Sequence, residues 1–329
     1  MEYKKPQATI IQGSVGIYPL TTADQVILAD GTRLEKDGKI NVDVANSADS
    51  AKLGGKAPEY YLQPRNLLDN SDFTNPVNQR GATSYTDATY GIDRWKTNMG
   101  VYMNVNVGTD RITLSKANSG GNFCQILPLD LIGKTVTYAV CTSHGVFCKS
   151  CVVSDTSVFK QIESKKAYLG VSSENGITTF QIYFNDSSDV QLDLYWAALY
   201  EGSYTIDTLP PYVPKGYAAE LAECMRYYYQ SWTGSRANTF DGVIICEAIA
   251  LSRATNVVFP QAMRISNPTV TLYSPATGNT GKASEFVSDT EIDAGSVYLS
   301  RNGFTLSSAA NMFEIGKHYC IHYSVSADL

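Results

Sequence analysis

The feature that most constrains the fold is a repeated alternation of apolar and polar residues in short runs. One example is Val101–Val107, which reads Val-Tyr-Met-Asn-Val-Asn-Val. Alternate side chains of a strand point to opposite faces, so such a run gives a strand with one buried side. Clusters of Gly, Asn, Asp and Ser separate the runs, which is typical of jelly rolls and β-sandwiches. The other runs of this kind between residues 65 and 208 are Arg111–Leu114, Thr135–Val140, Thr178–Phe184 and Val190–Tyr195.

A second group of strand-like runs predicts a smaller C-terminal β-sandwich over residues 240–329. Gly, Asn and Ser again divide these runs, as turn signals do between short strands. We therefore expect a mainly β protein with a jelly-roll or β-sandwich domain at 65–208 and this smaller sandwich after it. The C-terminal runs are Asp241–Leu251, Thr269–Tyr273, Ser296–Leu299 and His318–Val325.

Residues 209–239 connect the two predicted sandwiches. Leu209–Pro214 holds three prolines and predicts a stiff hinge, since each proline fixes its own backbone and restricts the residue before it. A short helix is expected after it, from about Tyr217 to Tyr229. Leu221, Met225 and Tyr228 recur at helical spacing and predict one buried stripe.

Residues 1–64 predict an attachment and shaft-connector region. A strand-like run ends in Asp30-Gly31, a strong turn signal, and the run Asp43–Gly55 is rich in small residues. This region carries too little apolar bulk for an independent domain, yet its strand-like pieces need partners. We therefore expect a homotrimer in which small residues let neighbouring chains approach closely. A monomeric flexible linker is the alternative.

Composition excludes some functions and favours an intracellular site of synthesis. The 329 residues suggest two or three domains, and 43% hydrophobic with 18% charged residues indicates a chain that folds. A net charge of -6 argues against a general binder of nucleic acid or of an anionic membrane, and we expect no membrane insertion. Because Met1–Pro6 has no apolar core after its basic residues, no secretory signal is expected.

The cysteines and histidines give weak metal signals. The seven Cys are odd in number and lie on apolar, strand-like runs, so we interpret them as reduced, buried side chains. Cys148 and Cys151 form a lone CxxC near His144, but on a strand they would face opposite ways. His318 and His322 stand four apart on an apparent strand and would share a face, either as a metal pair on a trimer axis or as ordinary strand histidines. We expect no resident metal and no cofactor.

No catalytic constellation stands out. The chain has no Ser-His-Asp order, nucleophile elbow or phosphate loop. Asp186 and Asp189 lie in a stretch that predicts a turn. A sequence gives no distance between carboxylates, so a glycosidase stays open as an alternative.

Several segments, taken in their order along the chain, resemble modular phage tail fibres and tail-associated receptor-binding proteins. The resemblance to the opening of the carbohydrate-binding-module-like jelly roll of those fibres lies in Asn66–Phe73, Asn78–Gly81 and Tyr90–Trp95. The resemblance to the passage from such a module to the fibre tip lies in Trp196–Ser203 and Glu220–Tyr229, and the resemblance to the closing sandwich lies in Phe259–Arg264, Asn267–Val270 and Tyr323–Leu329. Asp43–Tyr61 resembles a shaft connector.

The resemblance implies receptor recognition and attachment of a virion. It implies tail or baseplate proteins as partners of the N-terminal region and a host cell-surface glycan or protein as the target. The expected location is the tail of a virion or tail-like particle, made in the host cytoplasm. Related jelly rolls hold a structural calcium with an acidic residue where this chain has Thr74, so Asp72 or Asp193 would have to supply ligands.

The Asp93-Arg94-Trp95 motif supports a structural interpretation ahead of a sugar platform. Arg94 can stack on the tryptophan or pair with a carboxylate, and such a cluster fastens the edge of a sandwich.

We therefore expect a non-enzymatic attachment protein whose loops on the C-terminal sandwich carry the binding residues. Two loops are candidates: Gln230–Arg236, with Trp232 and Arg236, and Ser274–Gly281, with Asn279 and with Tyr273 at its base. Trp232 could instead pack as core beneath the tip. The alternative functions are a fibre-borne glycan depolymerase and a purely structural tail or baseplate component.

Overall fold

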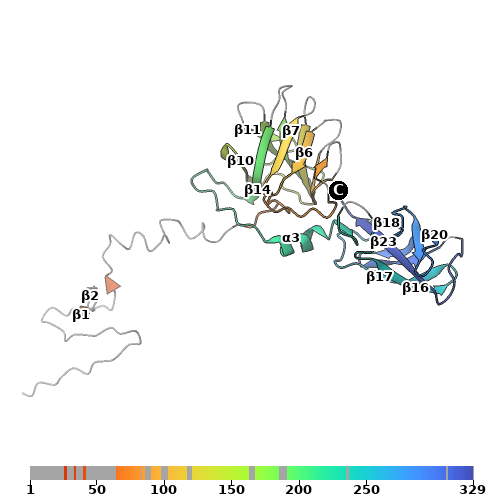
Figure 1. Cartoon of the computed structure of the whole chain (residues 1–329). Coiled ribbons are helices and arrows are strands. Elements are labelled where there is room, and N and C mark those ends of the chain that lie inside the picture. Colours follow the sequence, from red (N-terminus) through yellow and green to blue (C-terminus); the bar gives the residue numbers. More distant parts are fainter. Residues whose placement is uncertain are drawn as a thin grey trace, which may run out of the picture. The chain divides into compact units, whose positions relative to one another are not determined.

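The computed structural model describes residues 26–27, 33–34, 40–41, 64–81, 83–85, 90–97, 103–116, 121–162, 167–184, 191–234, 237–308 and 310–328. The chain divides into two compact units, Met1–Gln63 and Pro64–Leu329. Strands predominate and are joined by a short helix, α3 (Tyr217–Cys224) (Figure 1). Within these ranges, no helix combines the length and the apolar character that a membrane span requires.

The first unit contains a small antiparallel sheet. Its strands β1 (Val26–Ile27), β2 (Arg33–Leu34) and β3 (Ile40–Asn41) pair in that order. The strand predicted before Asp30-Gly31 is therefore present as β1. The turn itself and the Asp43–Tyr61 connector lie outside the described residues.

The jelly roll consists of two antiparallel sheets with one core between them. The first has the order β10-β9-β14-β7-β6-β4 and the second the order β11-β12-β13-β8-β5. All five runs predicted as strands are present, as β6, β7, β9, β13 and β14. The bounds are β4 (Ser84–Tyr85), β5 (Trp95–Thr97), β6 (Met103–Val107), β7 (Ile112–Lys116), β8 (Gly121–Leu127), β9 (Thr135–Thr142), β10 (Gly145–Val152), β11 (Val158–Ile162), β12 (Ala167–Glu174), β13 (Ile177–Phe184) and β14 (Gln191–Glu201).

Trp95 anchors the jelly-roll core. It is fully buried and stacks on Phe123, with ring centroids 4.8 Å apart and planes 14° apart. Its indole N–H donates to the carbonyl of Asn70 at 2.8 Å. The structural interpretation of the Asp93-Arg94-Trp95 motif is thus confirmed, although Arg94 stacks on Tyr227 rather than on the tryptophan, with its guanidinium carbon 3.5 Å from the ring centroid.

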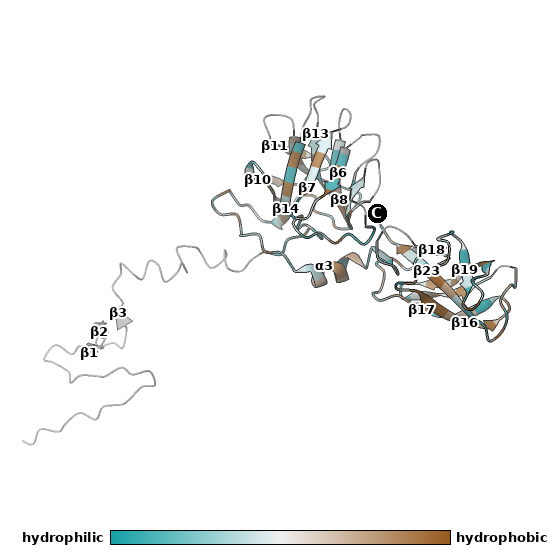
Figure 2. Cartoon of the chain, in the orientation of Figure 1, coloured by the Kyte–Doolittle hydropathy of each residue, from teal (hydrophilic) through white to brown (hydrophobic). Residues whose placement is uncertain are grey.

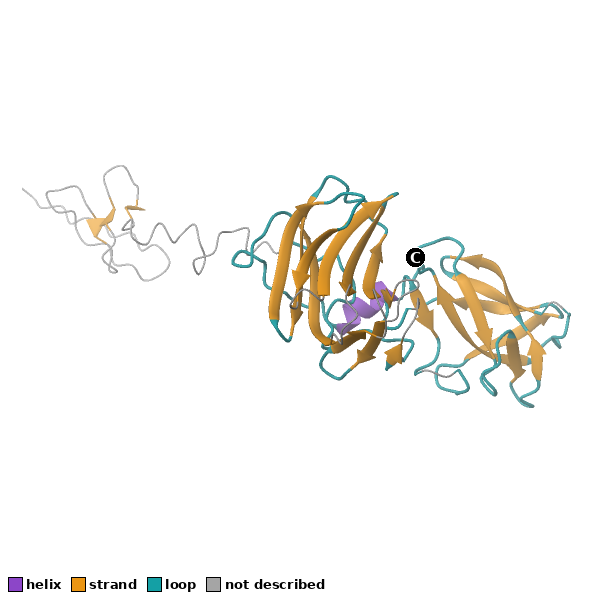
Figure 3. Ribbon diagram, turned by 90° about the horizontal axis from the view of Figure 1, so that it is seen from above, coloured by secondary structure: helices purple, strands orange, loops and turns teal. Residues whose placement is uncertain are grey.

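Helix α3 is shorter than predicted, and it buries a different face. It ends at Cys224, and Tyr228 already belongs to strand β15 (Tyr228–Gln230). Its buried residues are Glu220 and Cys224, whereas the predicted stripe of Leu221, Met225 and Tyr228 is only partly buried. The prediction was wrong because Glu220 accepts a hydrogen bond from the backbone N–H of Asn70 at 2.7 Å, a contact with the jelly roll that helical periodicity does not reveal. Figure 3 shows the helix beside the jelly roll.

The proline segment before α3 packs on the jelly roll. Tyr212 stacks on Trp196 with ring centroids 4.8 Å apart and planes 2° apart. Pro210 is buried, and Lys215 at the end of the segment forms an ion pair with Asp69 at 3.3 Å. The segment predicted as a hinge therefore has specific side-chain contacts on the jelly roll.

The C-terminal part of the second unit is one antiparallel sheet of nine strands that curls around its own core. Its centre is β23 (His318–Ser326). The first half of β23 pairs with β16 on one edge and β19 on the other, and its second half pairs with β15 and β18. Tyr323 of β23 packs against Phe259 and Phe304 in the core. The other strands are β16 (Ile244–Ala250), β17 (Arg253–Val258), β18 (Thr269–Tyr273), β19 (Lys282–Glu285), β20 (Glu291–Asp293), β21 (Gly295–Ser300) and β22 (Gly303–Ser307). The mainly β fold class is confirmed.

Polar contacts join the C-terminal sheet to the jelly roll through Arg80. Its guanidinium bonds to Asp93 at 2.8 Å and to Asp328, just after β23, at 2.5 Å. The same group lies 3.6 Å from the centroid of the Tyr228 ring. The Gln79 amide donates both to Asp93 and to the backbone carbonyl of Tyr228. Four of the segments that carry the resemblance therefore contribute residues to these contacts: Asn78–Gly81, Tyr90–Trp95, Glu220–Tyr229 and Tyr323–Leu329.

Candidate functional site

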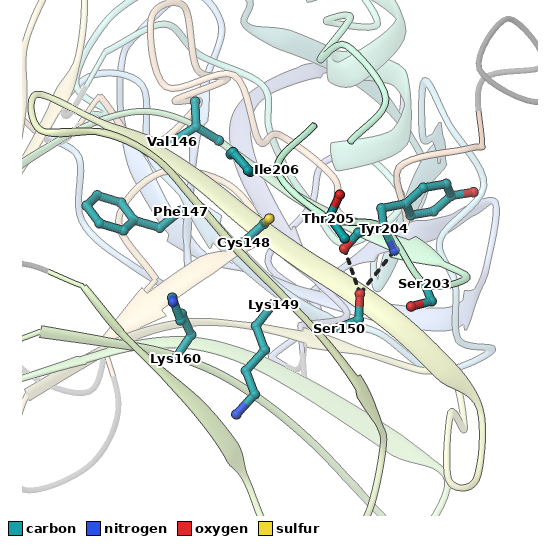
Figure 4. Close-up of a pocket in the computed structure, with 10 residues that line it drawn as sticks. All are labelled: Val146, Phe147, Cys148, Lys149, Ser150, Lys160, Ser203, Tyr204, Thr205 and Ile206. Carbon is teal, nitrogen blue, oxygen red and sulfur yellow. Dashed lines mark hydrogen bonds between the residues drawn. The ribbon is translucent and has the colours of Figure 1, made fainter. Parts of the chain in front are cut away.

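Strand β10 forms one wall of an open cleft of about 440 Å³ on the jelly roll, which we call the β10 cleft. Lys160 of β11 and the segment after β14 complete it (Figure 4). The lining residues are Val146, Phe147, Cys148, Lys149, Ser150, Lys160, Ser203, Tyr204, Thr205 and Ile206.

The β10 cleft offers an apolar wall and two cations, Lys149 and Lys160. Val146 and Ile206 are 37% and 54% exposed. Ser150 is engaged, since its hydroxyl donates to the carbonyl of Tyr204 and accepts from the N–H of the same residue. Burial raises the pKa of the Cys148 thiol, and the nearby Lys160 lowers it only in part, so the thiol stays protonated at neutral pH. The cleft therefore suits binding better than thiolate chemistry.

The cysteines are free thiols, as predicted. Cys151 packs against the jelly-roll core, whereas Cys148 lines the β10 cleft, so the two thiols of the CxxC face different surroundings. The expectation that all seven are buried was wrong for Cys141, Cys148 and Cys151, which are partly exposed. Cys148 and Cys151 lie on β10, the edge strand of the first sheet, and Cys141 lies on the neighbouring strand β9.

Two of the predicted binding residues, Trp232 and Tyr273, lie together. Their rings meet edge to face with centroids 5.0 Å apart. Trp232 is only 8% exposed, and its indole N–H has no hydrogen-bond partner among the described residues. Tyr273 is half-buried, so a ligand at this surface would meet Tyr273 before Trp232.

His322 completes the buried side of this cluster. Its ring centroid lies 5.7 Å from that of Trp232. Its Nε2 donates to the carbonyl of Thr239 at 2.7 Å, so Nδ1 accepts from the Ser231 hydroxyl at 2.9 Å. Burial lowers the pKa of His322, which keeps the ring neutral. His318 is exposed, so the interpretation as ordinary strand histidines fits better than a metal pair.

The predicted Asn279 is exposed on the neighbouring loop. Its side-chain amide donates to Glu291 at 3.1 Å. The loop also approaches the segment after Trp232, since a Cβ on Gly278 would lie 3.4 Å from the Cβ of Asn238. Arg236, the fourth predicted binding residue, lies outside the described residues. The two candidate loops are thus adjacent, while the role of each residue stays a prediction.

A second open cleft, of about 520 Å³, was not predicted from the sequence. We call it the Tyr298 cleft, after a tyrosine of β21 that is 65% exposed. The guanidinium carbon of Arg253 lies 4.7 Å from the centroid of this ring. The run Ser296–Leu299 predicts a plain strand, and its alternation gives no sign of the irregular backbone at Tyr298. The lining residues are Ser252, Arg253, Asp293, Ala294, Gly295, Val297, Tyr298, Ser307, Ser308 and Asn311.

Three carboxyl groups with raised pKa values lie outside both clefts, at the junction where the jelly roll contacts helix α3 and the C-terminal sheet. Burial raises the pKa of Asp93 to about 6 against the opposing effects of Arg80 and Gln79. Burial also raises the pKa of Glu220 and Asp328. All three accept hydrogen bonds from protein groups, which is typical of structural carboxylates. Asp186 and Asp189, the carboxylates of the predicted turn, lie outside the described residues.

The candidate calcium ligands have protein partners instead. Asp72 accepts from the N–H and the hydroxyl of Thr74, and Asp193 accepts from Arg111 and Thr113. Within the described ranges, no group of three or more His, Cys, Asp and Glu side chains is arranged to hold a metal ion.

Comparison with known proteins adds no family assignment: no protein-family model matches the chain, and no curated protein matches it.

Proposed function

We propose that this chain is a non-enzymatic attachment protein of the phage tail-fibre type that recognises a host-surface glycan or protein. In this proposal the N-terminal unit joins a tail or tail-like particle and supports a homotrimer, and the C-terminal sheet presents the recognition surface.

The observation that carries the proposal is the apolar surface of the C-terminal sheet. Of the twenty large apolar side chains that are exposed in the described residues, eleven lie beyond residue 239, a stretch that holds little more than a third of the described residues. Val287 is 86% exposed and Val258 74%. Ile249 of β16 and Val258 of β17 belong to strands with marked hydrophobic stretches (Figure 2). Exposed apolar groups in such number favour contact with another surface.

The contacts between the jelly roll and the C-terminal sheet support the same proposal, because they fix the C-terminal sheet to the rest of the chain. Arg80 and Arg94 lie over Tyr228 and Tyr227, and Arg80 also pairs with carboxylates on both sides. Charge-assisted hydrogen bonds of this kind are stronger than neutral ones. A recognition surface that meets a host cell needs such a connection to the rest of the particle.

Labelled full-length protein applied to a panel of bacterial strains tests the proposal, with release of reducing ends measured in parallel. We expect retention on a subset of strains without release of sugar. Retention with release would indicate a depolymerase. Absence of retention on every strain would favour a structural tail component and would overturn the proposal.

A further inference from the structure

The backbone of Tyr298 adopts a conformation that tyrosine rarely takes. Its φ is 51°, in the left-handed region that suits glycine or asparagine. The residue lies in an irregularity of the β21–β22 ladder, where the register shifts between Val297 and Ser300. Bulges redirect side chains, and strained residues persist where the surrounding structure holds them. Because the ring is 65% exposed, packing in the core does not account for this tyrosine.

Tyr298 lines two clefts. One is the 520 Å³ Tyr298 cleft, and the other is an adjoining cleft of about 240 Å³ that Val258 and Asn302 also line. The floor of the Tyr298 cleft includes Gly295, where an added Cβ would meet only the Ser307 hydroxyl, at 3.6 Å. A glycine at this point keeps the cleft open.

Arg253 supplies the charge of the Tyr298 cleft. Its guanidinium stacks on Tyr298, and among the described residues it has no ion-pair partner. The carboxylate that lines the same cleft, Asp293, is engaged by Lys282 at 2.8 Å. The planar guanidinium therefore keeps its fork of N–H donors for a carboxylate from outside the chain.

We propose that the Tyr298 cleft binds an acidic sugar, with the C–H face of a pyranose ring on Tyr298 and its carboxylate on Arg253. The hydroxyls of Ser252 and Ser307 and the exposed amide of Asn311 provide partners for sugar hydroxyls. The adjoining cleft gives room for a second ring of an oligosaccharide. This inference rests on the proposed function, since it names the ligand class that the recognition surface would take.

A matched pair of ligands tests the charge requirement. Methyl β-D-glucuronide and methyl β-D-glucoside differ only in the carboxylate, and saturation-transfer NMR with the full chain measures the Kd of each. We expect the glucuronide to bind about tenfold or more tightly, because a hydrogen bond between charged groups exceeds a neutral one by about that factor. Equal affinity for both, or no binding of either, would overturn the proposal.

Tyr298→Gly tests the site without destabilising the fold, because glycine adopts a φ of 51° without steric strain. We expect the glucuronide Kd to rise about tenfold or more while the melting temperature does not fall. Arg253→Gln should weaken glucuronide binding and leave the glucoside little changed. Tyr217→Ala, at an exposed tyrosine on α3, is the matched control and should alter neither Kd. Glucuronide binding that survives both Tyr298→Gly and Arg253→Gln would remove the sugar from this cleft.

The strain-panel assay separates the two proposals. If Tyr298→Gly loses glucuronide binding but the wild-type chain is retained on no strain, the sugar site stands and the attachment role fails. If the wild-type chain is retained on cells and Tyr298→Gly is retained equally, attachment stands and the receptor contact lies elsewhere.

Discussion

Replacing Asp93 by asparagine should change how stability depends on pH. Asp93 shares the Arg80 guanidinium with Asp328, so one partly buried cation faces two carboxyl groups. Burial raises the pKa of Asp93 from 3.8 to about 6 in the folded protein, although Arg80 and Gln79 oppose the rise. At 1.36 kcal/mol for each pKa unit, this shift corresponds to about 3 kcal/mol of unfolding free energy.

The sign of the effect follows from which state holds the proton more tightly. The folded state does, so the contribution of protonated Asp93 is fully present below pH 3.8 and is lost as pH rises through about 6. In Asp93→Asn this titration is absent. We therefore expect the stability of the wild type relative to Asp93→Asn to fall by about 2–3 kcal/mol between pH 4 and pH 7.

Urea unfolding of both proteins at half-unit intervals of pH measures this difference directly, because the other carboxyl groups titrate in both. Asp328→Asn tests the cause. It removes the charge that competes for Arg80, so the window in which Asp93 titrates should move to lower pH. Parallel stability curves for the wild type and Asp93→Asn between pH 4 and pH 7 would refute the reasoning.

Three further predictions concern assembly and packing. Mass measurement in solution should give a trimer of the full-length chain, and a stable monomer would contradict this expectation. Gly303→Ala should lower the unfolding free energy by about 2–4 kcal/mol, because its Cβ would lie 2.0 Å from the carbonyl oxygen of Val257. Thermal melts measure this loss, and Gly295→Ala, whose Cβ would meet no such clash, is the control in the same experiment. Trp232→Phe removes a buried N–H that has no partner among the described residues, so it should leave stability unchanged or raise it by about 1 kcal/mol, whereas Trp232→Ala should lower it by about 3–5 kcal/mol. A loss of about 1 kcal/mol or more from Trp232→Phe would show that the indole N–H has a partner.

The strands could be predicted because their signal is local. A period of two in Thr135–Val140 or Thr178–Phe184 reports burial on one side, and the structure forms β9 and β13 there. The end of the helix was predicted wrongly because the sequence Tyr227–Tyr229 suits a strand as well as a helix. Pairing with β23, about a hundred residues later in the chain, makes it a strand. The mainly β class followed from many such local signals at once.

The candidate site was harder to predict because its geometry depends on distant partners. Trp232 and Tyr273 were named from loop composition, and the pairing of β15 and β18 with opposite edges of β23 places their rings together. Tyr298 went unnoticed because an irregular register of the ladder, rather than the residues around it, sets its φ. Arg80 meets Asp328 across nearly 250 positions, a pairing to which no sequence period points.

The central place of β23 has a consequence for synthesis. Its nine residues leave the ribosome after every strand with which they pair. The jelly roll can therefore fold while translation continues, but the C-terminal sheet lacks its middle until residues 318–326 have emerged. Until then β15, β16, β18 and β19 expose the edges that β23 will occupy, and unpaired edges invite pairing with other chains. A chain that terminates early by about a dozen residues would carry an intact jelly roll and a C-terminal sheet that cannot close.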